Sequence, residues 1–157
     1  MNNTVVDLPS EEVLQEAIET FWETFPPVWR RIRSNLRLII ANHFEITVEE
    51  FHILRNVCHG VRSASELATV LQISRPAVSQ AVDGLVEKGL LSRETNFRDR
   101  RFVTLEITAA GSELINTIFQ INRNWMKAKM AGLSTEEIAS ISRALKILKD
   151  TFVEPAA

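Results

Sequence analysis

A short stretch near the middle of this 157-residue chain carries side chains that can read the edges of DNA bases. In the major groove, arginine suits guanine and glutamine suits adenine. Val78, Val82 and Leu85 share one face of a helical pattern and must lie inside, so the other positions face outward. We predict DNA contacts from six of these positions, Ser74, Arg75, Ala77, Ser79, Gln80 and Asp83. The alternative is an ordinary solvated helix face.

Arginine is also concentrated further along the chain, between residues 93 and 101, where four arginines stand beside two acidic residues. The negative potential of a DNA minor groove attracts arginine. We expect contacts to DNA from Arg93, Arg98, Asp99, Arg100 and Arg101, with Asp99 bracing Arg101. A solvated loop tip is the alternative interpretation of this run.

The net charge of −2, from 18 basic and 20 acidic residues, conceals a segregation of charge along the chain. Residues 1–25 hold six acidic residues and no basic one, whereas residues 28–101 hold twelve basic and eight acidic residues. A chain with a negative total can therefore still present a local basic surface to DNA.

Other chemistries find little support in the sequence. No tyrosine, paired-carboxylate constellation, glycine-rich phosphate loop or nucleophile motif is present, so we predict a protein that is not an enzyme and has no cofactor. His52 and His59 would lie about 10.5 Å apart along a helix, too far to share a metal ion. Cys58 falls beside Leu54 and Val57 on an apolar helix face, which favours a buried thiol over an oxidant sensor.

The elements that must position these residues are mostly helices. Ser10 opens an apolar pattern of helical period, which Pro26 and Pro27 must break or kink before a second pattern runs from residue 28 to about residue 43. Thr47 and Ser63 each precede a glutamate by three residues, as in a capping box that opens a helix.

The polar stretch itself has helix signals at both ends. Ser74 is a typical cap, Pro76 falls in the first turn where its missing N–H costs little, and Gly89 ends the pattern. Only Gln72 and Ile73 separate this helix from the preceding one, which indicates a tight turn between two helices.

After this helix, the period of the apolar residues changes. Residues 103–107 alternate as a β-strand does, and residues 90–95 can pair with them across a polar loop. Thr108 then caps a long helix that ends near Gly132, and Ser134 opens the last helix.

Two helices joined by a short turn and followed by a hairpin form a winged helix-turn-helix. We predict a mainly α fold with a small β-hairpin wing, in which helices from both chain ends form a dimerisation region. The expected domains are residues 1–45 (N-terminal dimerisation helices), 46–108 (winged helix-turn-helix lobe) and 109–157 (C-terminal dimerisation helices).

The ordered set of motifs resembles the MarR family of bacterial transcriptional regulators over roughly residues 28–152. The motifs are Ser65-Glu66-Leu67-Ala68, Ser74-Arg75-Pro76-Ala77-Val78-Ser79, Leu85-Val86-Glu87-Lys88-Gly89-Leu90-Leu91, Arg98-Asp99-Arg100-Arg101 and Leu105-Glu106-Ile107-Thr108-Ala109-Ala110-Gly111. Gln72 departs from the family pattern, because a glycine is common at that position.

The resemblance implies an obligate homodimer that binds a pseudo-palindromic operator in double-stranded DNA and is often released by a small ligand. We expect a transcriptional repressor with an apolar or aromatic effector. The aromatic residues near the N-terminal helices are first expected to form core, and second to line an effector pocket made by Trp22, Trp29, His43 and Phe44. A winged helix that binds another protein instead of DNA is the alternative function.

The compartment follows from cysteine usage and hydropathy. One cysteine suggests a reducing environment, and no apolar run approaches the roughly 18 residues of a membrane span. We expect a cytoplasmic protein without a membrane partner.

Overall fold

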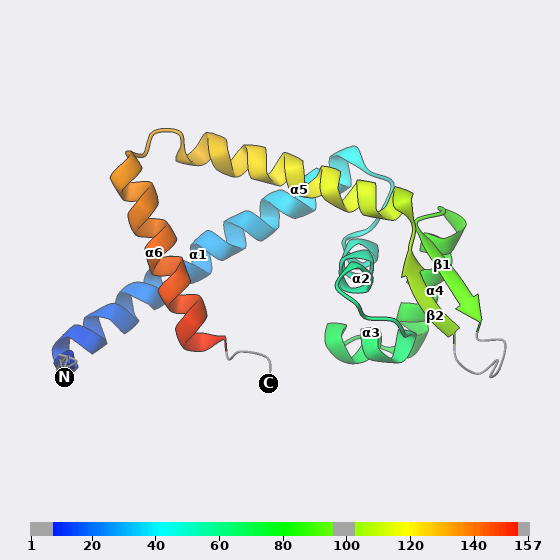
Figure 1. Ribbon diagram of the computed structural model, residues 1–157, viewed down its shortest axis with the longest axis horizontal. Coiled ribbons are helices and arrows are strands. Elements are labelled where there is room, and N and C mark those ends of the chain that lie inside the picture. Colours follow the sequence, from blue (N-terminus) through cyan, green and yellow to red (C-terminus); the bar gives the residue numbers. More distant parts are fainter. Residues whose placement is uncertain (1–7, 96–102, 154–157) are drawn as a thin grey trace, which may run out of the picture. The chain divides into compact units, whose positions relative to one another are not determined.

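The computed structural model describes residues 8–95 and 103–153, and within these ranges it contains six helices and one two-stranded antiparallel sheet (Figure 1). The mainly α fold is confirmed. The elements are α1 (Glu11–His43), α2 (Val48–Cys58), α3 (Ala64–Leu71), α4 (Arg75–Glu87), β1 (Leu91–Thr95), β2 (Val103–Ile107), α5 (Ala109–Met130) and α6 (Thr135–Phe152). The chain divides into two compact units, Met1–Ile115 and Asn116–Ala157. None of the described helices is long and apolar enough to cross a membrane.

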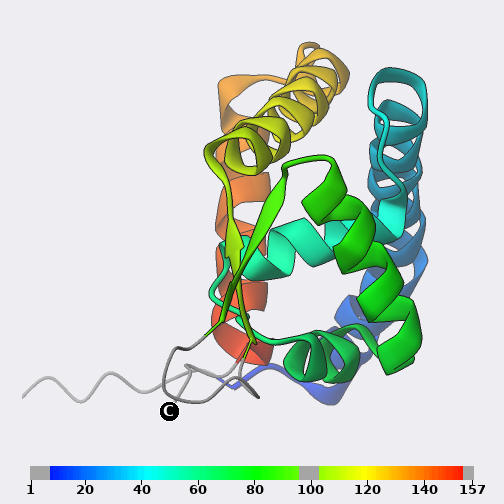
Figure 2. The ribbon, with the colours of Figure 1, turned by 90° about the vertical axis from the view of Figure 1, so that its right-hand side faces the viewer.

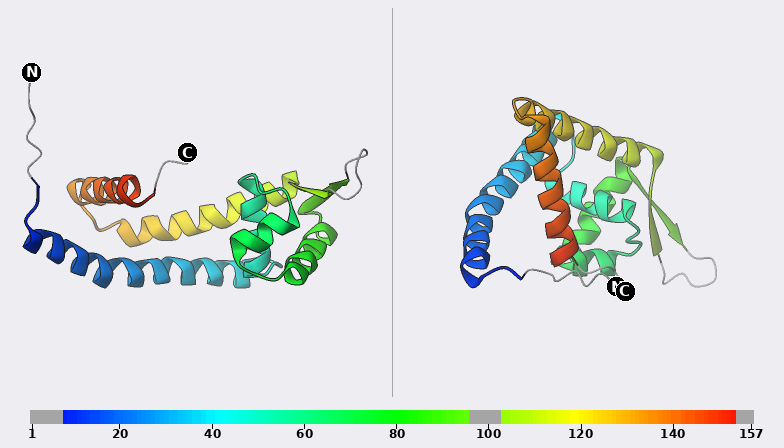
Figure 3. Two further views of the ribbon diagram at one scale, coloured as in Figure 1. Left: turned by 90° about the horizontal axis from the view of Figure 1, so that it is seen from below. Right: turned by 60° about the vertical axis from the view of Figure 1, so that its left-hand side comes forward.

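Helix α1 runs through Pro26 and Pro27, so of the two predicted effects, a break or a kink, the break is wrong. Figure 3 shows the helix as one continuous, gently curved ribbon. A proline ring fixes φ near −65°, which suits a helix, and what it removes is the hydrogen bond to the carbonyl four residues earlier. Trp22 and Glu23 lose these bonds but are exposed, so water can satisfy their carbonyl oxygens.

Serine and threonine caps open the helices where they were predicted. The caps that accept a hydrogen bond from the backbone N–H three residues on are Ser10, Thr47, Ser63, Ser74 and Ser134. The capping boxes at Thr47 and Ser134 are complete. The box predicted at Ser63 is not, because Glu66 Oε2 accepts from the backbone N–H of Arg62 at 3.1 Å. Glu66 therefore fixes the turn before α3 as well as the first turn of the helix.

One apolar core holds the winged helix-turn-helix lobe together. Helix α2 contacts α4 and β2, and α4 also contacts α3 and β1, an arrangement that can be followed in Figure 2. The core side chains with at most 2% exposure are Phe51, Ile53, Leu54, Val57, Leu67, Val78, Val82, Leu85, Leu91 and Leu105. Burial of each such leucine or valine contributes about 1.5–3 kcal/mol. Ile39 and Ile40 are buried too, which anchors the end of α1 to this unit.

The hairpin has the predicted strands and a single register. Leu91 pairs with Ile107 and Thr95 with Val103, and the backbone N–H of Leu105 also donates to the carbonyl of Arg62 at 2.8 Å. The alternation of side chains along β2 places Leu105 in the core. The hairpin is thus attached to the lobe through both its backbone and its inward side chain.

The turn between α3 and α4 contains a left-handed residue that is not glycine. Gln72 has φ 56° and ψ 39°, and it caps the C-terminus of α3. The left-handed conformation costs a residue with a Cβ about 1–2 kcal/mol. The departure of Gln72 from the glycine of the family pattern therefore carries an energetic cost, although the turn keeps its conformation.

We expect Gln72→Gly to stabilise the protein by about 0.5–1 kcal/mol, since the relief of the left-handed strain exceeds the entropy that glycine loses on folding. The midpoint and slope of urea unfolding would measure this. Gln80→Gly is the control, because an exposed glutamine inside α4 should instead be destabilised by about 1 kcal/mol. A loss of stability in the Gln72 variant would contradict the prediction.

The junction between β2 and α5 brings two backbones into close contact. Thr108 Oγ1 donates to the carbonyls of Gly89 at 2.8 Å and Leu90 at 3.1 Å, and it accepts from the backbone N–H of Gly111 at 3.0 Å. The Thr108 hydroxyl therefore caps α5 and also ties the end of the hairpin to the residues just before β1. A side chain at Gly111 would have no space, because a Cβ there would lie 2.2 Å from the carbonyl oxygen of Leu90.

Candidate nucleic-acid interface

The start of α4 presents a polar face to solvent while the opposite face is buried. Val78, Val82 and Leu85 are at most 1% exposed, as the helical period predicted. Ser74 caps the helix by accepting from the backbone N–H of Ala77 at 3.3 Å. Of the six predicted contact residues, Ser74, Arg75, Ser79, Gln80 and Asp83 are exposed and Ala77 is half-buried. The structure therefore leaves the N-terminal half of this helix free to enter a groove.

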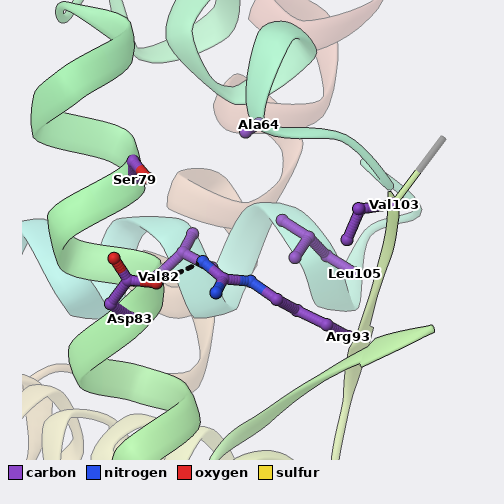
Figure 4. Close-up of a pocket in the computed structure, with 7 residues that line it drawn as sticks. All are labelled: Ala64, Ser79, Val82, Asp83, Arg93, Val103 and Leu105. Carbon is purple, nitrogen blue, oxygen red and sulfur yellow. Dashed lines mark ion pairs between the residues drawn. The ribbon is translucent and has the colours of Figure 1, made fainter. Parts of the chain in front are cut away.

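Asp83 and Arg93 form an ion pair that joins α4 to β1. Their side chains meet at 2.5 Å between Asp83 Oδ1 and Arg93 Nη2, as Figure 4 shows. We predicted that both residues contact DNA. Their pairing with each other was not predicted, and it forms because the hairpin folds back toward the last turns of α4. Both side chains are partly exposed, so the pair itself adds little stability and acts mainly to orient the hairpin.

An open cleft of about 450 Å³ lies between α4 and the hairpin. It is lined by Ala64, Ser79, Val82, Asp83, Arg93, Val103 and Leu105 (Figure 4). The Asp83–Arg93 pair crosses it, and Ser79 faces it from α4. The cleft separates the two elements that were predicted to contact DNA, so the pair sets the spacing between them.

The other predicted wing contacts belong to the arginine run that follows β1 in the sequence. Arg98, Asp99, Arg100 and Arg101 lie outside the described residues, and Arg93 is the one member of the set that the structure positions. The described strands bring the chain up to Thr95 and resume at Val103 directly opposite, so the arginine run connects the far ends of the two strands.

A second ion pair fixes the opposite end of α4. Lys88 Nζ donates to both oxygens of Glu50, at 2.7 and 2.9 Å, and Glu50 Oε2 also accepts from the backbone N–H of Thr47 at 2.7 Å. Glu50 is only 6% exposed. Gly84 makes the space, because a Cβ at this position would lie 3.0 Å from Glu50 Oε1. The carboxylate thus both caps α2 and holds α4 against it.

Sequence reasoning missed this pair. A glutamate at the third position of a capping box is usually exposed, so Glu50 gave no sign of burial. The available signal was Gly84, a residue that costs about 1 kcal/mol inside a helix and therefore indicates a close contact from another element.

The residues expected to line an effector pocket do not come together within one chain. Trp22 and Trp29 lie on α1 and are 67% and 50% exposed. His43 is the last residue of α1 and Phe44 is its cap. At 1.5 Å per residue, Trp22 and His43 are about 31 Å apart along the helix, which is longer than one small-molecule pocket.

The thiol of Cys58 is exposed, so the predicted burial is wrong. Cys58 is the last residue of α2, and the chain turns away at Gly60, so Val57 is the last residue of the helix that the core covers.

Burial and the nearby charges of Arg33 and Arg55 lower the pKa of His52 below its ordinary value. Within residues 8–95 and 103–153 there is no cluster of three His, Cys, Asp or Glu side chains that could hold a metal ion.

Comparisons with known proteins show what this lobe is similar to. Residues 44–101, which include α2, α3, α4 and the first strand of the hairpin, β1, match the model of the MarR family. An uncharacterized HTH-type transcriptional regulator of Bacillus subtilis, YpoP, is 32% identical over 89 residues. That match covers 56% of this chain, and it spans 62% of the length of the Bacillus protein.

Solved structures extend the similarity of fold to most of the chain. The transcriptional regulator Tm0710 of Thermotoga maritima has a TM-score of 0.69 and 26% identity, covering 82% of this chain and 94% of its own. A variant of S. aureus MepR bound to an oligodeoxyribonucleotide has a TM-score of 0.65 and 21% identity, covering 84% of this chain and 97% of its own. Residues 44–101 therefore match the MarR family, and the chain has the fold of these solved winged helix-turn-helix proteins.

Proposed function

We propose that the protein is a transcriptional regulator that binds double-stranded DNA by inserting the N-terminal half of α4 into the major groove. The observation that carries this proposal is the division of α4 into a buried apolar face and an exposed face with Ser74, Arg75, Ser79 and Gln80. Its N-terminus adds backbone N–H groups that favour phosphate. Arg75 pairs with guanine and Gln80 with adenine in this proposal.

The hairpin supplies the second contact. The Asp83–Arg93 pair holds β1 against α4, and the arginine run between the strands lies along the adjacent minor groove, where the negative potential attracts it. In this arrangement Asp83 positions the wing and does not itself read a base. The MepR structure with an oligodeoxyribonucleotide shows that a protein of this fold binds DNA.

The proposed binding unit is a homodimer of two chains on a pseudo-palindromic operator. A two-fold protein places its two recognition helices on half-sites about one helical turn apart, roughly 10 bp between centres. The exposed apolar residues of the terminal helices favour this, because surface such as Leu145, Ile147 and Phe152 on α6 needs a cover. Residues 1–45 and 109–157 are the proposed dimerisation regions, and residues 46–108 the DNA-binding lobe.

We further propose that the protein represses transcription in the cytoplasm and that a small apolar or aromatic ligand releases it from DNA. A ligand that weakens operator binding must prefer the non-binding arrangement, with a typical coupling of about 1–3 kcal/mol. Since Trp22 and His43 lie far apart in one chain, an effector site made by these residues would need the second chain of the dimer.

The test is the affinity of the Arg75→Ala variant for an operator selected from genomic fragments by the purified protein. We expect a loss of about 1–3 kcal/mol on the selected operator and a relaxed preference at one base position per half-site. Fluorescence anisotropy at several salt concentrations would measure both. Arg123→Ala is the matched control, because it removes one exposed arginine of α5, outside the lobe.

If the Arg75 and control variants bind the operator with equal affinity, Arg75 does not contact DNA. If the purified protein selects no DNA and passes through a heparin column at low salt, the lobe is a protein-interaction module instead. If the affinity for DNA depends on salt but not on sequence, the protein binds DNA only through the phosphate backbone.

A further inference from the structure

Within the described residues, helix α1 exposes large apolar side chains along most of its length. Leu14, Ile18, Trp22, Phe25 and Trp29 are 41–67% exposed. Their rings stack along the helix, with Phe25 5.1 Å from Phe21 and 6.5 Å from Trp29 between ring centroids. A continuous apolar face of this kind, with aromatic residues at its middle, indicates an interaction surface.

The spacing of this face is symmetric about Phe25. Between residues 14 and 36, the apolar positions that lie within about 60° of Phe25 around the helix are Leu14, Ile18, Phe21, Trp22, Phe25, Val28, Trp29, Ile32 and Leu36. Each one before Phe25 has an apolar counterpart at the same distance after it, at 3, 4, 7 and 11 residues. These distances are close to whole helical turns, so all nine share one side of the helix. Two antiparallel copies that cross at Phe25 would place an apolar residue opposite every apolar residue.

The charges of α1 are segregated about the same point. Before Phe25 the helix carries only acidic charges, Glu11, Glu12, Glu16, Glu19 and Glu23. After it the charged residues are arginines, Arg30, Arg31, Arg33 and Arg37. An antiparallel pair sets each acidic half against an arginine half, whereas a parallel pair sets like charges together.

The dipole of the helix does not explain this segregation. Acidic residues stabilise the first turn of a helix and basic residues the last turn, but the effect falls off within that turn. Glu19 and Arg33 lie two or more turns from either end of α1. Each residue of an α-helix is rotated by about 100° from the one before it. Viewed along the helix axis and measured in the same direction from Phe25, Arg33 lies at about 80° and Glu19 at about 120°, so both flank the apolar face on the same side. In an antiparallel pair with a two-fold axis, the same side of both helices meets.

We propose that α1 pairs with α1 of a second copy of this chain, antiparallel and crossing at Phe25, with Glu19 of each copy near Arg33 of the partner subunit. The proposal rests on the homodimer proposed above and specifies its register. Ile39 and Ile40 anchor the end of α1 in the core of its own lobe. The α1 pair therefore sets the distance between the two α4 helices, and so the half-site spacing that the dimer accepts.

The first experiment reverses the charges of each half separately. One variant carries Glu19→Arg and Glu23→Arg, and the other carries Arg33→Glu and Arg37→Glu. Each alone sets like charges together in its homodimer, so the two variants mixed should form more than about 90% heterodimer by native mass spectrometry, against the half expected for random assortment. A chain with all four substitutions should recover the homodimer, which also shows that the variants fold.

The second experiment reads the register directly by disulfide formation, with Cys58→Ser as the background because Cys58 is exposed. In the proposed pair, position 14 lies opposite position 36 and about 33 Å from its own copy along the helix. A Leu14→Cys chain should therefore form no disulfide alone but should join a Leu36→Cys chain rapidly. In a parallel pair, Leu14→Cys would form a disulfide with itself.

The outcomes separate this proposal from the proposed function. Random assortment of the charge variants, or a Leu14→Cys disulfide without a partner variant, overturns the antiparallel α1 pair. If the same protein still protects two half-sites of its operator, the regulator function stands and the dimer uses another register. If the disulfide between positions 14 and 36 forms but no DNA is bound, the pair stands and the proposed function fails.

Discussion

Gly111→Ala is expected to destabilise the protein by about 3 kcal/mol, because the added methyl group meets fixed backbone. The added Cβ would lie 2.2 Å from the carbonyl oxygen of Leu90 and 2.9 Å from Cγ1 of Ile107. The Leu90 carbonyl cannot move away easily, because it accepts from both the backbone N–H and the hydroxyl of Thr108. Overpacking typically costs 1–3 kcal/mol, and a clash with fixed backbone belongs at the upper end.

Urea unfolding of Gly111→Ala beside Gly132→Ala measures this effect. Gly132 follows α5, a Cβ there would meet no atom within 4 Å, and its φ is not in the left-handed region, so its substitution should change stability by less than about 0.5 kcal/mol. Similar small changes in both variants would show that the junction between β2 and α5 can relax. The same geometry explains in physical terms why the motif Leu105-Glu106-Ile107-Thr108-Ala109-Ala110-Gly111 ends in glycine.

Local patterns predicted most of the elements, because caps and period depend on residues only a few positions apart. Ser74 and the buried face of α4 are examples, since a hydroxyl cap and a repeat of three or four residues need no information from the rest of the chain. The same local reasoning fails at Pro26 and Pro27, where an exposed helix lets water replace two lost hydrogen bonds. It fails again at Cys58, where the helix ends before its period can bury the next residue.

Contacts between distant residues were beyond the reach of sequence patterns. Asp83 and Arg93 were each predicted to contact DNA from their own element, and their ion pair with each other was not predicted. Their pairing depends on the angle at which the hairpin meets α4, and no spacing in the sequence encodes that angle. For the candidate site this means that its exposed residues could be predicted one helix at a time, whereas the ion pairs that orient it could not.

Lys88→Met is expected to destabilise the lobe by about 3 kcal/mol. The substitution leaves the carboxylate of Glu50 almost fully buried, with the backbone N–H of Thr47 as its remaining hydrogen-bond partner among the contacts that the structure shows. Removing one partner of a buried ion pair costs about 3–5 kcal/mol, because an uncompensated charge remains. The Lys88 side chain is 38% exposed, so water can reach the site and the expected cost lies at the lower end of that range.

DNA binding should weaken together with stability in this variant, because Lys88 and Glu50 hold the C-terminal end of α4, and Arg75 lies at the other end of the same helix. The measurements are urea unfolding and operator affinity at a temperature where the variant is folded. Lys146→Met is the matched control, since it removes an exposed lysine of α6 and should change stability by less than about 0.5 kcal/mol.

A double variant separates the charge from the packing. Glu50→Met with Lys88→Met removes both charges and fills the space with apolar side chains, which often restores much of the stability lost by breaking a buried pair. The Thr47 cap interaction is lost as well, at about 1 kcal/mol. We therefore expect the double variant to be more stable than Lys88→Met alone, by about 1–2 kcal/mol. If it is less stable, the buried carboxylate is not the source of the cost, and the three hydrogen bonds of Glu50 stabilise the lobe through geometry that neither methionine can replace.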